Sequence, residues 1–231
     1  MLKLSIIIPC YNEQNTIKQL IDKVILSDIG NILKEIIVIN DGSSDKTRNI
    51  LSNIKKIKLL NNSSNIGKGY SVKRGIKEST GDYIIIQDGD LEYDPSDYKK
   101  LLDLFQNQNI HIVYGSRRLK KNKFSHLSFY LGGIFLTYLV NILFPFSKNI
   151  TDGHTCYKMF RANILKDLNI KSNGFELCPE LTVKFLKLGY SIYEVPISYN
   201  PRTNKDGKKI KWIDGLIAIY TILRFRIFND K

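Results

Sequence analysis

The chain has 231 residues, of which 43% are hydrophobic and 25% charged, as in an ordinary globular protein that buries its own core. Its three cysteines have no CxxC spacing, which argues against a disulfide framework and against a zinc site. Lys and Arg outnumber Asp and Glu by 35 to 22, and the resulting net charge of +13 indicates an anionic partner: nucleic acid, a phospholipid surface or a phosphorylated small molecule.

The first half of the chain alternates short apolar runs with segments of helical spacing. Runs rich in Ile or Val predict buried strands at 4–8, 35–39, 57–60, 83–86 and 110–114. Helical spacing of the apolar residues predicts helices at 17–25, 47–54, 69–78 and 98–105. The alternation predicts an α/β, Rossmann-like fold with a mainly parallel sheet, flanking helices, and ligand sites at the carboxyl ends of the strands.

From about residue 117 the alternation gives way to other patterns. Five cations and no acid occupy 117–123, an apolar run covers 129–146, and strand-like runs follow at 191–195 and 197–200. No internal repeat or low-complexity linker separates the two halves. We therefore interpret the second half as a C-terminal elaboration of the same domain.

The apolar run 129–146 has three interpretations. It is about as long as a short membrane span, it has the composition of a buried core helix, and it also suits a helix lying at the membrane interface. We favour the interfacial helix because the basic stretch 117–123 precedes it and would contact anionic lipid. The final stretch 212–228, apolar with Arg224 and Arg226 inside it, repeats this pattern.

Polar side chains follow three of the predicted strands, in the loops 9–13, 40–45 and 87–90, and we expect these loops to converge on one rim. In the last of them Asp88 and Asp90 place two carboxylates on one turn. Hard cations such as Mg²⁺ prefer carboxylates together with phosphate oxygens, so this pair is a candidate metal site across a diphosphate, with Glu92 as a third candidate ligand. A solvated acidic turn is the alternative interpretation.

The other two polar segments suit a nucleotide. Asp41 follows a strand, and its carboxylate can accept a hydrogen bond from the imide N–H of uracil or guanine. Lys68 lies between two glycines at a predicted helix start, where free backbone N–H groups and a lysine suit phosphate. For Ser44 and Asp45 we prefer helix capping.

Taken together these motifs resemble the family-2 glycosyltransferases with a GT-A fold, and within them the dolichol-phosphate mannose synthase or polyprenyl-phosphate glycosyltransferase group. The resemblance covers nearly the whole chain. The segments that carry it are 8–13, 38–45, 65–69, 81–95, 114–117, 151–158, 175–176, 194–199, Arg202 and 207–210.

The resemblance implies roles for individual residues and for the two halves. Residues 1–116 would form the nucleotide-sugar-binding half and 117–231 the acceptor-binding and membrane-interface half. The residues assigned to the nucleotide-sugar donor are Pro9, Tyr11, Glu13, Asp41, Lys68 and Asp88. Those assigned to Mg²⁺ or Mn²⁺ are Asp88, Asp90 and Glu92. Those assigned to the reaction are Asp90, Arg117 at the acceptor phosphate, Arg202 at the donor diphosphate or acceptor, and Glu176 as a positioning group.

Three positions depart from the family pattern. Gly89 stands between the two aspartates where Ala is usual, and Asn40 replaces a frequent Asp. After Arg117 the family pattern leads us to expect a second arginine. The stretch instead offers Lys120, Lys121, Lys123 and His126.

The acceptor decides the mechanism. A phosphomonoester is largely dianionic near neutrality, because its second pKa is about 6. It can therefore attack the anomeric carbon without a general base, and one in-line displacement inverts that centre. The alternative is a saccharide acceptor in cell-surface polysaccharide synthesis, which needs a base, with Glu176 or Glu180 as the candidate. UDP and GDP sugars both remain open as donors.

The chain begins with a strand-like run and carries no signal-peptide pattern, so we expect a cytoplasmic protein, peripheral on the cytoplasmic face of the membrane. A membrane-anchoring partner protein is a further expectation, since the sequence has no clear pair of C-terminal spans. Nucleic-acid binding would explain the net charge. It is disfavoured because no nucleic-acid-binding motif is present and three acidic loops would repel a phosphate backbone.

Overall fold

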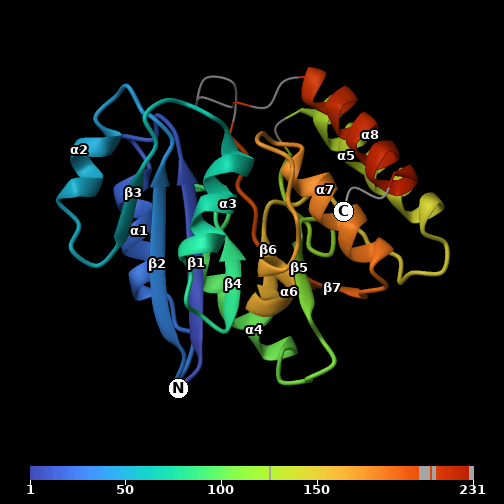
Figure 1. The fold of residues 1–231 in the computed structure, drawn as a ribbon, viewed down its shortest axis with the longest axis horizontal. Coiled ribbons are helices and arrows are strands. Elements are labelled where there is room, and N and C mark those ends of the chain that lie inside the picture. The colour runs from blue at the N-terminus through green and yellow to red at the C-terminus, as the bar shows by residue number, and fades with distance from the viewer. Residues whose placement is uncertain (125, 203–208, 210–211, 229–231) are drawn as a thin grey trace.

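The computed structural model describes residues 1–124, 126–202, 209 and 212–228, and their strands form one seven-stranded sheet (Figure 1). The strand order is β3-β2-β1-β4-β6-β5-β7. Strand β6 runs antiparallel to both of its neighbours, and every other pairing in this sheet is parallel. The bounds are β1 Lys3–Cys10, β2 Leu33–Asn40, β3 Lys58–Asn61, β4 Tyr83–Ile86, β5 Ile112–Ser116, β6 Lys158–Arg161 and β7 Ile192–Pro196.

Helices cover both faces of the sheet, because successive residues of a buried strand point to opposite sides. Along β1, Ile6 and Ile8 belong to the core on the side of α1, α2 and α4, and Ile7 belongs to the core on the other side. The first layer consists of α1 Ile17–Leu26, α2 Thr47–Ser52, the short 3₁₀ turn η1 Pro95–Asp97 and α4 Tyr98–Leu104. The second contains α3 Lys68–Glu78, α6 Ala162–Lys166 and α7 Leu177–Lys187.

The predicted α/β fold with a mainly parallel sheet is confirmed, and the strand and helix predictions of the first half agree with the structure to within about two residues at nearly every end. The second half differs. Strand β6 was not predicted, and the run 197–200 contributes only an isolated bridge between Tyr199 and Tyr93. Because β6 pairs with β4 and β5, the division at 116/117 lies within one continuous sheet.

Two long helices, α5 Leu127–Leu143 and α8 Trp212–Ile227, lie side by side at one end of the molecule (Figure 1). Helix α5 buries only Leu136, Thr137 and Val140, so the apolar run 129–146 does not form a buried core helix. No helix within the described residues is both long enough and apolar enough to cross a membrane. The large apolar side chains that α5 and α8 leave exposed include Leu131, Phe135, Tyr138, Ile142, Trp212, Leu216, Tyr220 and Ile227.

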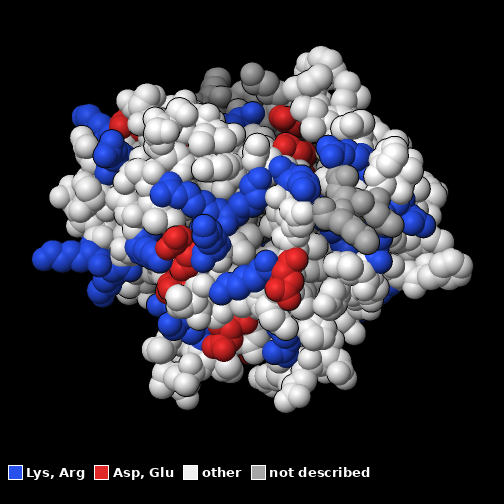
Figure 2. Space-filling model, viewed as in Figure 1, with Lys and Arg blue, Asp and Glu red and all other residues white. Residues whose placement is uncertain are grey.

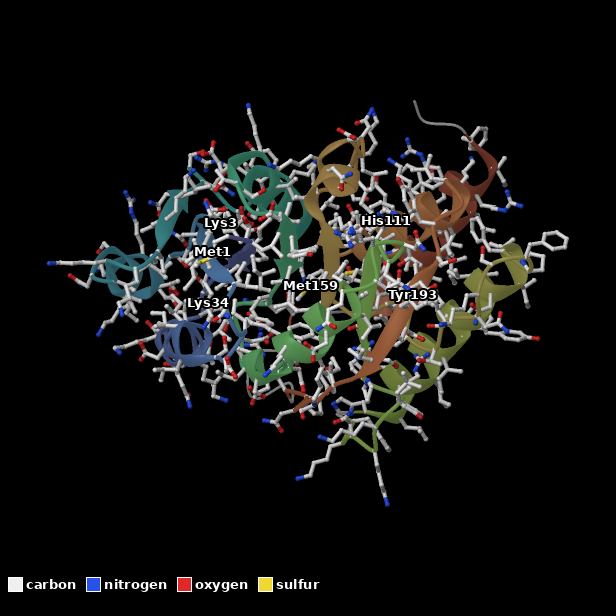
Figure 3. The ribbon with its side chains drawn as sticks, turned by 90° about the horizontal axis from the view of Figure 1, so that it is seen from below. Met1, Lys3, Lys34, His111, Met159 and Tyr193 are labelled. Carbon is white, nitrogen blue, oxygen red and sulfur yellow. The ribbon has the colours of Figure 1, made fainter. Side chains whose placement is uncertain are left out.

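The two edges of the sheet have different characters. Met1, Lys3 and Lys34 gather at the amino ends of β1 and β2, in the view from below (Figure 3). The polar loops after β1, β2 and β4 lie at the opposite edge, as expected for neighbouring parallel strands. On the face covered by α3 and α7, Lys and Arg side chains form a broad band with acidic side chains between them (Figure 2).

Candidate functional site

The three polar loops meet at the carboxyl edge of the sheet. The Asp41 N–H donates to the Cys10 carbonyl at 2.8 Å, and the Thr16 hydroxyl donates to the Gly89 carbonyl at 3.3 Å. Together the loops form one side of a cavity of about 860 Å³. Of the residues predicted from the sequence, those lining this cavity are Pro9, Tyr11, Glu13, Asp41, Lys68, Asp88, Asp90, Glu92, Arg117 and Arg202.

Asp88 is paired with the first residue of α3. The Lys68 ammonium forms an ion pair with its carboxylate, and both side chains are largely buried, at 10% and 16% exposure. Burial alone would lower the pKa of Lys68, but the neighbouring Asp88 carboxylate raises it well above its usual value. Gly67 makes this helix start possible, because its φ of 123° suits glycine and a Cβ would meet the Asn173 carbonyl oxygen at 2.4 Å.

Asp90 shares a buried charge network with residues from both ends of the chain. Arg202 donates to the Asp90 carboxylate at 2.7 Å and bidentately to Glu13, with two contacts of 3.0 Å. Lys209 adds a contact of 2.6 Å to Glu13. Burial, together with the charges of Asp88 and Glu92, raises the pKa of Asp90 to about 7, although Arg202 opposes that shift. A cation therefore already faces each of the two predicted metal-binding aspartates.

Glu92, the third predicted metal ligand, uses its carboxylate for other contacts. Its carboxylate accepts the Tyr199 hydroxyl at 3.1 Å and the Arg202 backbone N–H at 2.7 Å. Within the described part of the chain, no group of three or more His, Cys, Asp or Glu side chains is arranged to hold a metal ion. The donor set at this edge is thus two carboxylates, which suits a Mg²⁺ that takes one or two protein ligands and completes its shell with phosphate oxygens and water.

Asp41, predicted to contact the nucleotide base, lines the cavity at the end of β2 and uses its carboxylate to hold a loop. It accepts the Asn62 side-chain amide at 2.6 Å and the backbone N–H groups of Ile66 and Gly67 at 3.2 and 2.8 Å. These bonds position the turn that leads into α3 and therefore into Lys68.

Steric contacts explain why glycine, and not alanine, stands between the two aspartates. A Cβ on Gly89 would lie 2.8 Å from the Cβ of Cys10 and 3.0 Å from the Pro9 carbonyl oxygen. Contacts this short force a shift in the end of β1. The departure from the usual Ala therefore follows from the close approach of the β4 turn to β1.

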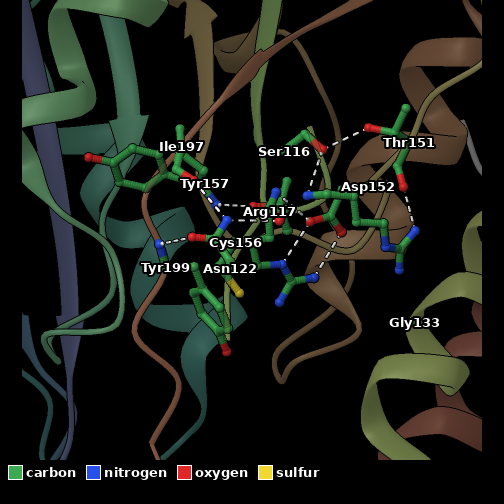
Figure 4. Close-up of polar contacts among 12 residues, drawn as sticks. Ser116, Arg117, Asn122, Gly133, Thr151, Asp152, Cys156, Tyr157, Ile197 and Tyr199 are labelled. Carbon is green, nitrogen blue, oxygen red and sulfur yellow. Dashed lines mark hydrogen bonds and ion pairs between the residues drawn. The ribbon is translucent and has the colours of Figure 1, made fainter. Parts of the chain in front are cut away.

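Arg117 lines the same cavity as the aspartates and is held by the fully buried carboxylate of Asp152 (Figure 4). Its Nε and Nη2 donate to Asp152 at 2.7 and 2.8 Å, and its backbone N–H donates at 3.1 Å. Burial would raise the pKa of Asp152, but Arg117 lowers it, so both groups are charged. The guanidinium also lies 5.2 Å from the centre of the Tyr199 ring.

The structure does not bring Glu176 to the cavity lining. This residue precedes α7, and its carboxylate accepts the backbone N–H groups of Asn173 and Gly174 at 3.1 and 2.9 Å. Glu180, the other candidate base, is fully buried and accepts from Lys171, Ser172 and Lys184. Both carboxylates organise the segment before α7 and its first turns.

Several lining residues were missed by the sequence analysis. Arg118, directly after Arg117, lines the cavity and donates to Thr137 at 3.1 Å and to the Thr151 carbonyl. Arg118 is thus a second arginine beside Arg117 in the cavity wall, and its adjacency to Arg117 was the available signal. His154 also lines the cavity, and its ring nitrogens have no partner among the described residues.

Comparison with known proteins agrees with this geometry. The model of the family "Glycosyl transferase family 2" matches residues 5–168. The chain is 29% identical to a dolichol-phosphate mannosyltransferase of Pyrococcus furiosus, over 100% of this chain and 66% of that protein. It is 30% identical to a dolichyl-phosphate beta-glucosyltransferase of Trichomonas vaginalis, over 98% of this chain and 73% of that protein.

Solved structures share the fold. A glucosyl-3-phosphoglycerate synthase from Mycobacterium tuberculosis, in complex with Mn²⁺, UDP-glucose and phosphoglyceric acid, superposes with a TM-score of 0.78 at 19% identity. The match covers 100% of this chain and 81% of that chain. The same enzyme with Mg²⁺ and UDP superposes with a TM-score of 0.76. The expected GT-A fold is thereby confirmed.

Proposed function

Because this chain belongs to glycosyl transferase family 2, we propose that it moves a sugar from a UDP or GDP sugar to a polyprenyl or dolichyl phosphate, inverting the anomeric centre. The observation that carries the proposal is a single cavity whose lining brings Lys68, Asp88, Asp90 and Arg202 together with Arg117. Relatives named as dolichyl-phosphate glycosyltransferases support this choice of acceptor.

On the donor side the chain's own groups receive a nucleoside diphosphate. Tyr11 and Asp41 line the part of the cavity at the ends of β1 and β2, where we place the base. Lys68 at the start of α3 and Arg202 are placed to neutralise the departing diphosphate, which develops negative charge as the glycosidic bond breaks. Both cations contact Asp88 or Asp90 in the structure, so they must exchange part of these contacts for phosphate oxygens.

Asp88 and Asp90 would hold Mg²⁺ or Mn²⁺, which when bound adds positive charge to the leaving diphosphate. Solved relatives crystallised with these ions support the cofactor. We leave Glu92 out of the ligand set, because its carboxylate serves Tyr199 and the Arg202 backbone.

On the acceptor side two arginines face a phosphate that needs no base. Arg117 is fixed by Asp152 in two N–H contacts, which orients its remaining N–H groups, and Arg118 lies beside it. Arginine suits this role because its planar fork binds phosphate oxygens bidentately. A saccharide acceptor would need a general base, and Glu176 and Glu180 are both engaged by backbone amides.

The apolar surface of α5 and α8 suits a lipid acceptor. Phe129, Gly133 and Leu136 of α5 and Trp212 and Ala218 of α8 line the same cavity as Arg117. The exposed apolar side chains of these helices continue outward from it, and the cations of 117–123 precede them. We propose that this face lies on an anionic membrane, which places the phosphate of a polyprenyl chain at the arginines.

The test is a donor panel of UDP and GDP sugars with Mg²⁺ or Mn²⁺, scored for release of nucleoside diphosphate with and without a polyprenyl phosphate. We expect release to require one donor and the lipid phosphate, with labelled sugar recovered in the lipid phase. EDTA should stop the reaction and added metal should restore it. Release that depends on a saccharide, or label that stays in the aqueous phase, would favour the saccharide acceptor.

Vesicle flotation tests the membrane face separately. The protein should float with vesicles containing anionic lipid, and Phe135→Ser combined with Tyr220→Ser should weaken this binding. The matched control is Leu26→Ser, because Leu26 is 82% exposed but lies at the end of α1, away from α5 and α8. Equal binding of the control and the double variant would contradict the proposed face.

A further inference from the structure

Two cysteines stand together in the wall of the cavity. Cys156 lies in the segment before β6, and Cys178 is the second residue of α7. Their sulfur atoms are 3.7 Å apart, both thiols are free, and both residues line the cavity. Because the two sulfur atoms are already this close, a side-chain rotation at one or both residues would bring them to bonding distance.

The surroundings of Cys178 favour a reactive thiol. It lies in the first turn of an 11-residue helix, where the helix dipole favours negative charge. The pKa of Cys178 is lowered to about 6 by the contact with Cys156 and by the ammonium groups of Lys68 and Lys158. Burial acts in the opposite direction. Reactive cysteines occupy electropositive sites of this kind that open toward solvent.

The third cysteine provides an internal contrast. Cys10 is buried at the end of β1, and its thiol donates to the Ile39 carbonyl at 3.5 Å. Burial and the nearby Glu13 carboxylate raise the pKa of Cys10 far above its usual value. Although Cys10 lines the same cavity, an oxidant should therefore distinguish it from the adjacent pair Cys156 and Cys178.

We propose that Cys156 and Cys178 form a reversible oxidation site, at which hydrogen peroxide or a small disulfide oxidant converts the two thiols into an intramolecular disulfide. With peroxide, the Cys178 sulfur attacks one oxygen, the O–O bond breaks, and a sulfenic acid and one water form. The Cys156 sulfur then attacks the Cys178 sulfur, the S–O bond breaks, and a second water leaves. In sum, the two thiols lose two electrons and two protons, and one peroxide is reduced to two waters.

The disulfide would change the donor side of the cavity. It would tie the first turn of α7 to the segment before β6, beside Lys68, whose ammonium pairs with Asp88. The proposal concerns the thiols alone and does not depend on the transfer reaction. It can therefore be tested without donor or acceptor.

The test treats the folded protein with an equimolar amount of hydrogen peroxide, then counts thiols and measures the intact mass. We expect two of the three thiols to disappear, a mass loss of two hydrogen atoms, a peptide pair linking Cys156 to Cys178, and full recovery with dithiothreitol. Cys10→Ser should show the same loss of two thiols. In Cys156→Ser, Cys178 should instead be trapped as a sulfenic acid by dimedone.

Retention of all three thiols, equal oxidation rates for Cys10 and the pair, or disulfides found only between molecules would overturn the proposal. Protein unfolded in urea serves as the reference, because there the three cysteines should react at similar rates. Circular dichroism of each variant before oxidation ensures that the comparison is made on folded protein.

Discussion

Arg202 and Glu13, separated by 189 positions in the chain, form a bidentate ion pair with two contacts of 3.0 Å. Glu13 lies in the loop after β1, and Arg202 lies in the segment after β7. The Arg202 guanidinium also reaches Asp90 at 2.7 Å. A residue of the second half of the chain therefore completes the charge network on the donor side.

Removing this arginine should destabilise the fold. Arg202→Ala leaves the carboxylates of Glu13 and Asp90 buried with fewer partners, and we expect the free energy of unfolding to fall by about 3 kcal/mol. Urea unfolding measures this difference. The control is Lys18→Ala, which removes an ion pair with Asp22 whose side chains are 69% and 51% exposed and should leave stability nearly unchanged. Equal losses in the two variants would show that the buried network contributes no more than a surface pair.

Asp90 should make the stability of the metal-free protein depend on pH. Its pKa of about 7 in the folded state is raised by burial above the unfolded value of about 3.9. Between these pH values the native state holds a proton that the unfolded state has released. The contribution of Asp90 to stability is therefore greatest below about pH 4 and is lost as pH rises toward about 7. Asp90→Asn should lack this contribution. Unfolding of both proteins at several pH values measures the difference, which we expect to reach up to about 4 kcal/mol. Parallel pH curves for the two proteins would contradict it.

The two acidic positions of this turn should differ in activity. Asp90→Asn should lower the rate of transfer at least about 100-fold, because it removes a carboxylate from the proposed metal site. Glu92→Gln should cost clearly less, since the Glu92 carboxylate contacts Tyr199 and the Arg202 backbone. Initial rates at saturating metal test both, with circular dichroism to verify folding. A larger loss for Glu92→Gln would return Glu92 to the ligand set.

Substitution of Arg118, and not of Arg117, is the better test of the proposed acceptor arginines. Arg117→Ala would leave the fully buried Asp152 without its cation and should destabilise the fold by about 3 kcal/mol, which would obscure an effect on the acceptor. Arg118→Ala should raise the KM for a short, detergent-soluble polyprenyl phosphate about tenfold, and donor binding should stay unchanged. Lys121→Ala, on the exposed part of the same basic stretch, is the control. Identical KM values for the two variants would leave Arg118 without a role at the phosphate.

Gly89 should not tolerate the alanine that the family pattern leads us to expect at this position. A Cβ at this position would lie 2.8 Å from the Cβ of Cys10, and we expect Gly89→Ala to lower stability by about 1 to 3 kcal/mol. Cys10→Gly should recover part of this loss in the double variant. Cys10→Ala should not, because it keeps the Cβ. Thermal unfolding of the wild type, the three single variants and the two double variants measures this, and recovery by Cys10→Ala would locate the strain elsewhere.

The sequence by itself determined the first half of the fold and the meeting of three polar loops at the carboxyl edge of its sheet. Strands such as Tyr83–Ile86 are continuous apolar runs, and right-handed crossovers join β1, β2 and β4 into one parallel part of the sheet. The loops that follow these three strands therefore meet at one edge. The aspartates of the 87–90 loop were placed correctly for this local reason.

Only the tertiary structure decided the contacts between distant segments. Strand β6 was missed because its four residues carry no clear alternation, and its place between β4 and β5 depends on both partners. The same holds for Arg202 with Glu13 and for Cys156 with Cys178. Ion pairs and thiol contacts act over a few ångströms in space, and no periodicity along the chain reports which distant side chains will come that close.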